Sequence, residues 1–184
     1  LIIVILMSKS NNSINKVIKK LTREYKQINQ NPSQYYSVGY NPSDRMSWTF
    51  KLFGQPDTIF EGGIFDGIII FPIEYPNKPP IVKFIGNKNK NIPILYHPNI
   101  YKNGKVCISL LHEGVDEYNY ESNFERWLPQ HGVNSVLVSI AIMLTEPNCE
   151  SPANIDAKNE WEKDFDSYKK KIYRIVALSQ QEFE

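Results

Sequence analysis

The residues Tyr96-His97-Pro98-Asn99-Ile100 stand a short distance before Cys107 in the run Gly104-Lys105-Val106-Cys107-Ile108. A proline-rich run lies upstream of both, Phe71-Pro72-Ile73-Glu74-Tyr75-Pro76-Asn77-Lys78-Pro79-Pro80. A cysteine thiol can carry an acyl group as a thioester, and transfer of that group passes through a negatively charged tetrahedral intermediate. This oxyanion needs a neutral hydrogen-bond donor, and the Asn99 carboxamide is suited to that role. The pattern predicts acyl transfer through Cys107, although a lone cysteine is more often a buried apolar residue.

Hydrophobic periodicity predicts an α+β domain around these residues. Apolar residues at helical spacing predict an amphipathic N-terminal helix, with Ser13 or a nearby Asn as its N-cap and Asn31-Pro32 as its end. Alternating apolar and polar residues predict a four-stranded antiparallel meander, whose first strand has the weakest pattern. The expected strands are residues 35–40, 46–52, 64–71 and 81–85. One helix, four strands, an irregular region and then further helices is an α+β order.

Further helices are predicted after Cys107. Residues 133–144 are apolar almost all round, so this helix is expected to be buried and to end at Pro147. A shorter helix is expected over residues 156–163, followed by a C-terminal helix. One face of that last helix is marked by Phe165, Tyr168, Ile172, Ile175, Val176 and Ser179. Residues 86–91 are Gly, Asn and Lys only and are expected to form a solvated loop.

Composition limits the possible functions. At 184 residues and a formal net charge of +1, the chain is expected to form one domain and to bind no nucleic acid. The two cysteines, Cys107 and Cys149, cannot make a disulfide framework, and no metal-binding spacing of Cys or His is present. We therefore expect no bound metal or cofactor. Free thiols suit a reducing compartment, and Cys149 is interpreted as incidental.

The first residues are apolar, but residues 1–7 are too few to span a bilayer. They also lack the basic start and the small-residue cleavage site of a signal peptide. Because the chain begins with Leu1 and its first methionine is Met7, residues 1–12 are expected to be an extension outside the fold. Residues 13–184 would form the single catalytic domain. The alternative is a short hydrophobic anchor for a membrane or a partner, without direct membrane insertion.

A set of short motifs occurs in a defined order from about residue 13 to the C-terminus. The motifs are Tyr75-Pro76 with Pro79-Pro80, His97-Pro98-Asn99, Cys107, Trp127 with Pro129, and Glu146-Pro147-Asn148. In this order they resemble the ubiquitin-conjugating enzymes. Cys107-Ile108-Ser109 before a long acidic stretch, Glu125-Arg126-Trp127 and residues 151–157 resemble the G-type members, which have an active-site insertion.

The resemblance implies the ubiquitin-conjugating (UBC) fold and a thioester acyltransferase. Ubiquitin would pass from an activating enzyme, which uses ATP upstream, onto Cys107, and then to a protein lysine with a ubiquitin ligase, expected to be of the RING type. The implied setting is protein degradation in the cytoplasm, the nucleus or at the cytosolic face of the endoplasmic reticulum. The alternatives are a non-catalytic module of the same fold, an enzyme for another ubiquitin-like modifier, and a cysteine hydrolase using His112 or His131.

The resemblance also assigns roles to residues near the thiol. Asn99 would be the oxyanion donor, His97 with Pro98 would fix the turn, and Ser151, next to Glu150, would occupy the gate position near the thioester. The alternatives are that Asn99 is only a turn former and that Ser151 belongs to a plain turn before a helix. Since no general base adjoins Cys107 in the sequence, the lysine is expected to lose its proton to the local environment.

The stretch between Cys107 and Trp127 is acidic and longer than in minimal family members, though a residue shorter than in its closest look-alikes. It contains His112, Glu113, Asp116, Glu117, Glu121 and Glu125. Beside a thioester, such a loop can attract a lysine, orient an acceptor ubiquitin or gate the thiol. A charged loop of this kind is otherwise a solvated excursion.

Contacts with the activating enzyme and the ligase are expected on overlapping surfaces of the first helix and two loops. The expected residues are Lys16, Lys19, Lys20, Arg23, Asn77, Leu128 and Pro129. Asn77 departs from the family, whose members commonly place a large apolar residue there. A polar amide at this position is expected to weaken hydrophobic docking of a ligase.

Overall fold

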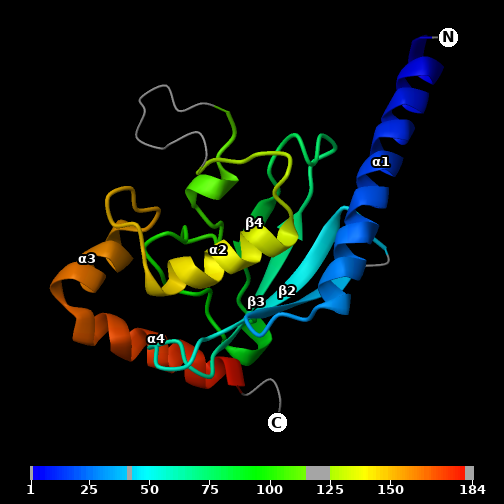
Figure 1. Cartoon of the computed structure of the whole chain (residues 1–184). Helices are drawn as coiled ribbons and strands as arrows, with labels where there is room; N and C mark the ends of the chain where they lie inside the picture. The colour runs from blue at the N-terminus through cyan, green and yellow to red at the C-terminus, as the bar shows by residue number, and fades with distance from the viewer. Residues whose placement is uncertain (1, 41–42, 115–124, 181–184) are drawn as a thin grey trace.

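The structure is a computed structural model that describes residues 2–40, 43–114 and 125–180, with residues 2–12 described as backbone only. Within these residues, a long helix precedes an antiparallel sheet of strand order β1-β2-β3-β4, and further helices follow (Figure 1). This is the expected α+β arrangement. The elements are α1 (Ile2–Gln30), β1 (Tyr36–Tyr40), β2 (Ser47–Phe53), β3 (Ile64–Ile70), β4 (Ile81–Phe84), the 3-10 turns η1 (Lys88–Lys90) and η2 (Ser109–Leu111), α2 (Val133–Thr145), α3 (Ile155–Lys163) and α4 (Phe165–Gln180).

Helix α1 ends where expected, at Gln30, but begins earlier than expected. The predicted N-cap at Ser13 is wrong, because α1 already begins at Ile2. Residues 2–12 contain no Gly or Pro that would interrupt the helix ahead of Ser13. The N-terminal end of α1 projects away from the sheet (Figure 1). The division into an extension and a domain beginning at residue 13 stays a prediction. No helix in the described part of the chain has both the length and the apolar content that crossing a membrane requires.

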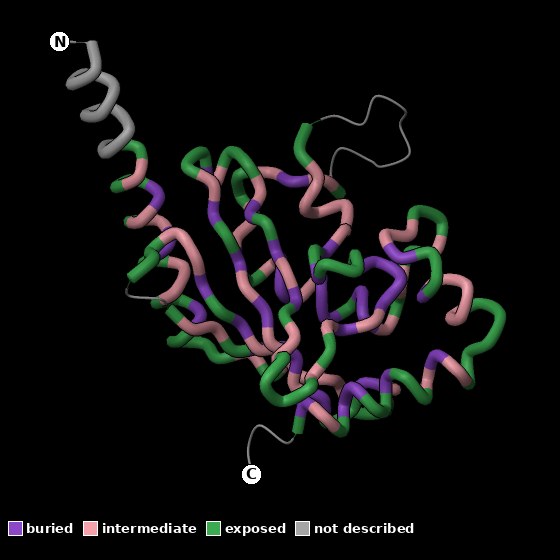
Figure 2. Tube along the Cα trace, turned by 180° about the vertical axis from the view of Figure 1, so that it is seen from behind, coloured by how far each residue is buried: buried purple, intermediate pink, exposed green. Residues whose placement is uncertain are grey.

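One face of the sheet is buried against α2. Along β2, the buried residues Trp48, Phe50 and Leu52 alternate with more exposed neighbours, as the sequence predicts for a half-buried strand. Two of these rings make edge-on contacts, Trp48 with Phe71, just after β3, at a centroid distance of 5.3 Å, and Phe50 with Phe84 of β4 at 5.4 Å. Figure 2 shows the buried positions alternating along the strands. The buried residues of α2 are Val133, Val136, Leu137, Ile140, Ala141, Met143 and Leu144.

Helices α3 and α4 lie at the end of the molecule opposite α1 (Figure 1). The expected face of α4 is buried except at Phe165, which is 43% exposed and contacts the rings of Trp161 and Tyr168. This exception follows from its position as the first residue of the helix, where the chain turns out of α3. The Ser179 hydroxyl accepts the N–H of Ile64 at 3.0 Å and so connects the end of α4 to β3.

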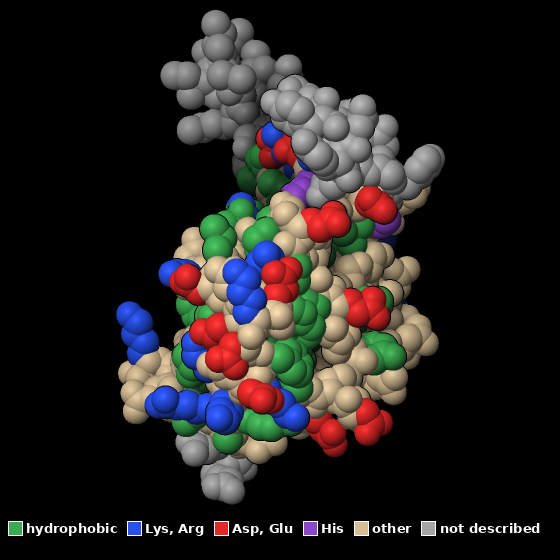
Figure 3. Space-filling model, turned by 90° about the vertical axis from the view of Figure 1, so that its left-hand side faces the viewer, with side chains coloured by type: hydrophobic (Ala, Val, Ile, Leu, Met, Phe, Trp, Pro, Cys, Tyr) green, Lys and Arg blue, Asp and Glu red, His purple; other side chains and the backbone are tan. Residues whose placement is uncertain are grey.

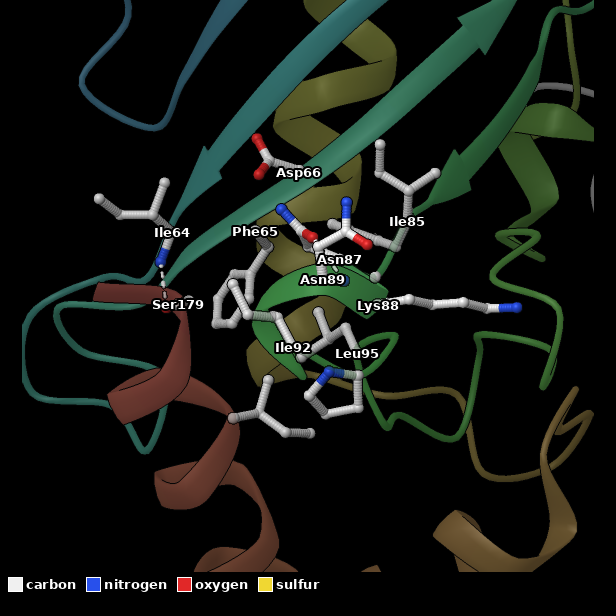
Figure 4. A pocket seen from close by; sticks show the side chains of 14 residues that line it. Ile64, Phe65, Asp66, Ile85, Asn87, Lys88, Asn89, Ile92, Leu95 and Ser179 are labelled. Atoms are coloured by element: carbon white, nitrogen blue, oxygen red, sulfur yellow. Dashed lines mark hydrogen bonds between the residues drawn. The ribbon is translucent and has the colours of Figure 1, made fainter. Parts of the chain in front are cut away.

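The expected solvated loop at residues 86–91 is exposed in part but also contains regular structure. Asn87 caps η1 through its side chain, which accepts the N–H groups of Asn89 and Lys90. Together with β3, β4 and α4, this segment encloses a cavity of about 210 Å³. In Figure 4, Phe65 and Leu95 lie around this space, while the Lys88 side chain extends away from it.

Candidate active site

The His97-Pro98-Asn99 turn is buried, and its hydrogen bonds fix the segment on which the site is built. The His97 ring is fully buried, and its Nδ1 accepts the N–H of Asn99 at 3.0 Å. The Pro98 carbonyl accepts the N–H groups of Ala153 and Asn154 at 2.8 and 2.9 Å. Burial lowers the pKa of His97 to about 3, which main-chain carbonyls at the end of α2 only partly oppose. His97 is therefore neutral near pH 7 and is a fixed part of the turn.

Asn99 is almost completely buried, and its carboxamide pairs with the main chain of Asn148. The Nδ2 group donates to the Asn148 carbonyl at 2.8 Å, and Oδ1 accepts the Asn148 N–H at 2.9 Å. A carboxamide carries two N–H bonds, so one donor of Nδ2 is committed to Asn148 and a second exists. The pair joins the turn to the segment that follows α2.

A tight turn brings Cys107 back over the residues that follow Asn99. Ile100 and Val106 form an isolated β-bridge, and the Cys107 N–H donates to the Asn99 carbonyl at 2.9 Å. Gly104 has a φ of +86°, and a Cβ there would lie 2.0 Å from a carbonyl oxygen of β4. The turn therefore requires glycine, and it holds Cys107 and Asn99 close together.

The Cys107 thiol is partly exposed and has two polar neighbours. Its Sγ lies 3.5 Å from His112 Nε2 and 3.9 Å from the Tyr101 hydroxyl. The charge that Cys107 carries as a thiolate raises the pKa of Tyr101, so the phenol stays protonated and can donate to the sulfur. The sequence motifs do not single out Tyr101. The sequence feature that could have identified Tyr101 is the turn at Gly104, which brings Cys107 back beside it.

Two grooves meet at Cys107. The first, here the amide groove, has a volume of about 610 Å³ and lies between the active-site turn and α2. Its lining includes Asn99, Cys107, His112, Ile142, Asn148 and Ser151. The second, here the proline groove, has a volume of about 400 Å³ and follows the proline-rich loop and the β3–β4 connection. Its lining includes Ile70, Pro79, Ile81, Tyr101, Lys105 and Cys107. A group carried on Cys107 therefore has space on two sides.

Asn148 connects the turn to the expected gate residues. Its Oδ1 accepts the N–H of Glu150 at 2.9 Å and the N–H of Ser151 at 3.3 Å. Both residues are exposed, and Ser151 lines the amide groove, whereas Glu150 is not among its lining residues. Asn148 thus positions this segment through its main chain and its side chain. The Glu146-Pro147-Asn148 motif is the sequence signal for it, but the motif does not reveal which atoms are used.

The two ends of the acidic insertion are tied together. The main-chain N–H of Trp127 donates to the His112 carbonyl at 3.1 Å, and Arg126 Nη2 donates to the Glu113 carbonyl at 3.1 Å. Glu125, at the far end, lines the amide groove with His112. The insertion therefore begins and ends beside the thiol. The expected loop residues between these ends lie outside the described residues: Asp116, Glu117 and Glu121.

Trp127 joins the two loops on which ligase contacts are expected. Its indole N–H donates to the Pro76 carbonyl at 2.7 Å, which connects the proline-rich loop to the segment after the insertion. Asn77 follows Pro76 directly and is exposed. Leu128 is half-buried and Pro129 is exposed. The three residues therefore belong to one connected surface.

Glu24 ties α1 to the same region. Its carboxylate accepts the Tyr75 hydroxyl at 2.8 and 2.9 Å and the N–H of Val133, the first residue of α2, at 3.0 Å. Burial, and then the charge of Glu24, raise the pKa of Tyr75, which keeps its hydroxyl protonated. Lys20 pairs with Glu24 at 3.1 Å. The remaining expected basic residues of α1 are exposed: Lys16, Lys19 and Arg23.

The surface charge is mixed. On the face shown in Figure 3, basic and acidic side chains are interspersed, with apolar side chains between them. Described ion pairs include Lys102 with Asp156 and Lys158 with Glu162, each at 2.7 Å. This distribution lacks, among the described residues of that face, the single-sign stripe that nucleic-acid binding requires.

Known proteins resemble this chain over most of its length. The family model described as ubiquitin-conjugating enzyme matches residues 20–176. Ubiquitin-conjugating enzyme E2 7 of Arabidopsis thaliana is 42% identical over 165 residues, which are 89% of this chain and 95% of the relative. Ubiquitin-conjugating enzyme E2 15 of Schizosaccharomyces pombe is 42% identical, with coverages of 86% and 92%. Ubiquitin-conjugating enzyme E2 G2 of Homo sapiens is 41% identical, with coverages of 88% and 95%.

The family match and these relatives show that the chain belongs to the ubiquitin-conjugating enzymes, which are transferases that act through a thioester. The accessible Cys107 thiol, where the two grooves meet, is consistent with that chemistry. Within that family it is of the G type. The expected UBC fold and activity are thereby confirmed, and the cysteine-hydrolase alternative loses its support.

Proposed function

We propose that Cys107 is the residue that accepts ubiquitin as a thioester and passes it to a protein lysine. The observation that carries this assignment is the place of its sulfur, accessible where two grooves meet and beside the fixed Asn99 carboxamide. Cys149 is the other candidate thiol. Burial raises the pKa of Cys149, which disfavours the thiolate that a nucleophile requires.

The reaction has two acyl transfers. In loading, the Cys107 thiolate attacks the ubiquitin carbonyl held as a thioester on the activating enzyme, whose thiol leaves. In transfer, a lysine amine attacks the new thioester, its carbonyl oxygen becomes an oxyanion, and Cys107 leaves as a thiolate while the amine gives up a proton. ATP is consumed upstream by the activating enzyme, so the conjugating enzyme needs no bound cofactor.

The Asn99 carboxamide is the proposed oxyanion donor. Its orientation is fixed by two hydrogen bonds to Asn148, and its second Nδ2 hydrogen is the one available to a new acceptor. A donor that is already in place costs no reorganisation when the negative charge develops. His97 and Pro98 support Asn99 by holding the turn.

The acceptor amine has to lose its proton close to Cys107. Ser151 in the amide groove, Glu150 next to it and the carboxylates of the acidic insertion are the proposed contributors. Carboxylates attract a cationic lysine, while partial desolvation near the thioester lowers the pKa of its amine. Both effects act without a dedicated general base.

The proposed ligase is of the RING type and binds the connected surface of Asn77, Leu128 and Pro129 together with the basic residues of α1. Asn77 offers an amide where an apolar anchor is usual, so the complementary ligase position would be polar. The proposed location is the cytoplasm, with the nucleus and the cytosolic face of the endoplasmic reticulum as further sites of action.

The test is a charging reaction with activating enzyme, ATP and a panel of modifiers, followed on non-reducing gels. We expect a ubiquitin adduct that disappears on addition of a reducing agent. Charging by a different ubiquitin-like modifier alone would replace ubiquitin in this proposal. No adduct with any modifier would overturn it.

A further inference from the structure

We propose that the cavity enclosed by η1, β3, β4 and α4, here the η1 cavity, is a binding site for a small uncharged aromatic molecule that carries a carboxamide. Among the described residues, its lining shares no member with either groove at Cys107. The site is therefore separate from the thioester chemistry. Three features support it: the size of the cavity, the division of its wall into an apolar and a polar part, and the charges around it.

The size of the η1 cavity suits one ring with a short substituent. Its volume is about 210 Å³. Since an apolar cavity of about 150 Å³ holds benzene, the remaining space accommodates about three further non-hydrogen atoms. A drug-sized molecule needs a pocket of about 300 Å³ or more and would not fit.

One part of the cavity wall is apolar and rigid. It consists of four buried side chains: Phe65 of β3, Phe84 of β4, Leu95, and Ile175 of α4. All four belong to the hydrophobic core, so their positions are set by packing and not by the exposed loop above them. An aromatic ring seated on this surface would be removed from water, which favours its binding.

The polar part of the wall is provided by η1 and its cap. The Asn87 side-chain oxygen accepts the N–H groups of Asn89 and Lys90 at 3.1 and 3.3 Å, which fixes its position. The exposed Asn89 carboxamide has no hydrogen-bond partner in the part of the chain that the structure describes, so it offers both a donor and an acceptor. In Figure 4, the Asn87 and Asn89 side chains lie on the side of Asp66, and Leu95 lies on the opposite side. A ligand amide can therefore pair with Asn89 while its ring contacts Leu95.

The charges around the cavity favour a neutral ligand. The charged residues of the described lining are Asp66 and Lys88. Asp66 forms an ion pair with its cross-strand partner Lys51 at 2.6 Å, and the Lys88 side chain extends away from the cavity (Figure 4). An anion in the cavity would be repelled by Asp66, and a cation would compete with Lys51. Either ion would also lose its hydration, which costs more than burying an uncharged amide.

The test uses three probes of nearly one shape: benzamide, which is neutral, benzoate, which is an anion, and benzylamine, which is a cation at pH 7. Each is titrated into the isotope-labelled full chain, and the backbone amide shifts are followed by NMR. We expect saturable shifts at Leu95 and Ile175 with benzamide, with a Kd on the order of 1 mM for a ligand of this size. Benzoate and benzylamine should bind about tenfold more weakly or less. Tighter binding of either ion would overturn the assignment of a neutral ligand.

Two neighbouring residues of η1 provide matched variants. Asn89→Ala removes the proposed partner of the amide and should weaken benzamide binding by about fivefold. Lys88→Ala changes the side chain that extends away from the cavity and should leave the affinity unchanged. Equal affinities of these two variants, or no shift at the lining residues with any probe, would overturn the proposal.

A third variant and a stability measurement test the location of the site. Ile92→Trp adds volume to a half-buried lining residue and should abolish the shifts at Leau95 and Ile175. If this variant does not fold, the comparison of the two η1 variants decides alone. In the unmodified protein, benzamide at ten times its Kd should lower the unfolded fraction about tenfold, because the unfolded chain has no cavity. Unchanged shifts in a folded Ile92→Trp protein would place the probe elsewhere and contradict the proposal.

Discussion

Asn99 and Asn148, 49 positions apart in the chain, are joined by two hydrogen bonds between one carboxamide and one stretch of main chain. Asn99 Nδ2 donates to the Asn148 carbonyl, and Asn99 Oδ1 accepts the Asn148 N–H. The pair fastens the buried turn to the segment after α2 and fixes the direction of the amide beside Cys107. The Asn99 side chain therefore has a structural role and a proposed chemical role. The first predicts a loss of stability when Asn99 is replaced, and the second predicts a slower transfer to lysine.

Asn99→Ala should slow transfer to lysine on the order of a hundredfold, because the developing oxyanion loses its donor. Loading should be slowed much less than transfer. The substitution also removes two part-buried hydrogen bonds to the Asn148 main chain, so the free energy of unfolding should fall by about 1–3 kcal/mol. Loading and discharge rates are measured separately in single-turnover assays, and stability by urea denaturation.

The matched control for this experiment is Asn148→Ala. It keeps the main-chain groups that pair with Asn99 and removes only the side-chain contacts to Glu150 and Ser151. Its discharge rate should therefore fall less than that of Asn99→Ala. If Asn99→Ala slows loading and discharge equally and modestly, Asn99 has a structural role only.

Cys107→Ser should accept ubiquitin as an oxyester that resists reducing agents, because an alkoxide is a poorer leaving group than a thiolate. Cys149→Ser removes the other thiol of the chain and should charge normally. Both variants are compared on reducing and non-reducing gels after charging. A folded Cys149→Ser protein that no longer charges would show that the nucleophile has been assigned to the wrong cysteine.

The sequence predicts those parts of the fold whose pattern is local. The alternation of Trp48, Phe50 and Leu52 identifies β2, and the apolar run from residue 133 identifies buried α2, because each period matches one kind of element. The start of α1 was not predictable in this way. A residue such as Ser13 marks the start of a helix only where the residues before it favour another conformation. Residues 2–12 are themselves helical, so Ser13 lies inside α1.

The candidate site divides in a similar way. Cys107 and Asn99 can be recognised together because a short turn links them along the chain. The carboxamide pair with Asn148 and the proline groove depend on contacts between segments far apart in sequence, which periodicity does not encode. Tyr101 is an intermediate case. It is close to Cys107 in sequence, but only the folded turn shows that its hydroxyl reaches the sulfur.

The buried His97 should make stability depend on pH. Its pKa is about 3 in the folded protein and about 6.5 in the unfolded chain. Between these values the unfolded chain binds a proton that the folded protein excludes, so stability is complete above about pH 6.5 and declines as the pH falls toward 3. The slope approaches about 1.4 kcal/mol per pH unit for one proton.

The measurement is urea denaturation of the unmodified protein and of His97→Asn from pH 7 to pH 4. Because all other titrating groups are shared, the stability difference between the two proteins isolates His97. This difference should shrink as the pH falls. A difference that stays constant over the whole range would contradict the assignment of a neutral, buried imidazole.

Glu24→Ala should lower the free energy of unfolding by about 1–3 kcal/mol, because it leaves the Tyr75 hydroxyl and the Val133 N–H without their acceptor. Lys20→Ala is the control. It removes the partly exposed ion pair with Glu24, which is worth about 0–1 kcal/mol, and the contact of the Lys20 ammonium with the Tyr75 ring at 5.8 Å, but it keeps both hydrogen bonds of Glu24. Urea denaturation at neutral pH compares the two, and equal losses would mean that Glu24 acts only through its surface charge.

The last prediction concerns the acidic insertion, whose effect on the acceptor lysine would depend on its charge and not on a defined geometry. Replacing Asp116→Asn and Glu117→Gln together should reduce ubiquitin chain formation and make its rate more sensitive to acceptor concentration. A lysine is cationic until it nears the thioester, so neutral amides would attract it less. Loading by the activating enzyme should be largely unchanged. The difference from the unmodified protein should shrink as salt rises, since exposed charges are screened beyond about 8 Å at physiological ionic strength.

The control is Asp166→Asn, which neutralises an exposed carboxylate in the first turn of α4, away from the lining of both grooves. It should form chains at the unmodified rate at every salt concentration. If the Asp116→Asn, Glu117→Gln protein does the same, the insertion is a solvated excursion, and the acceptor lysine is guided by other groups near Cys107. If the insertion variant loses chain formation but keeps discharge to free lysine at high concentration, its carboxylates act by raising the local concentration of the acceptor.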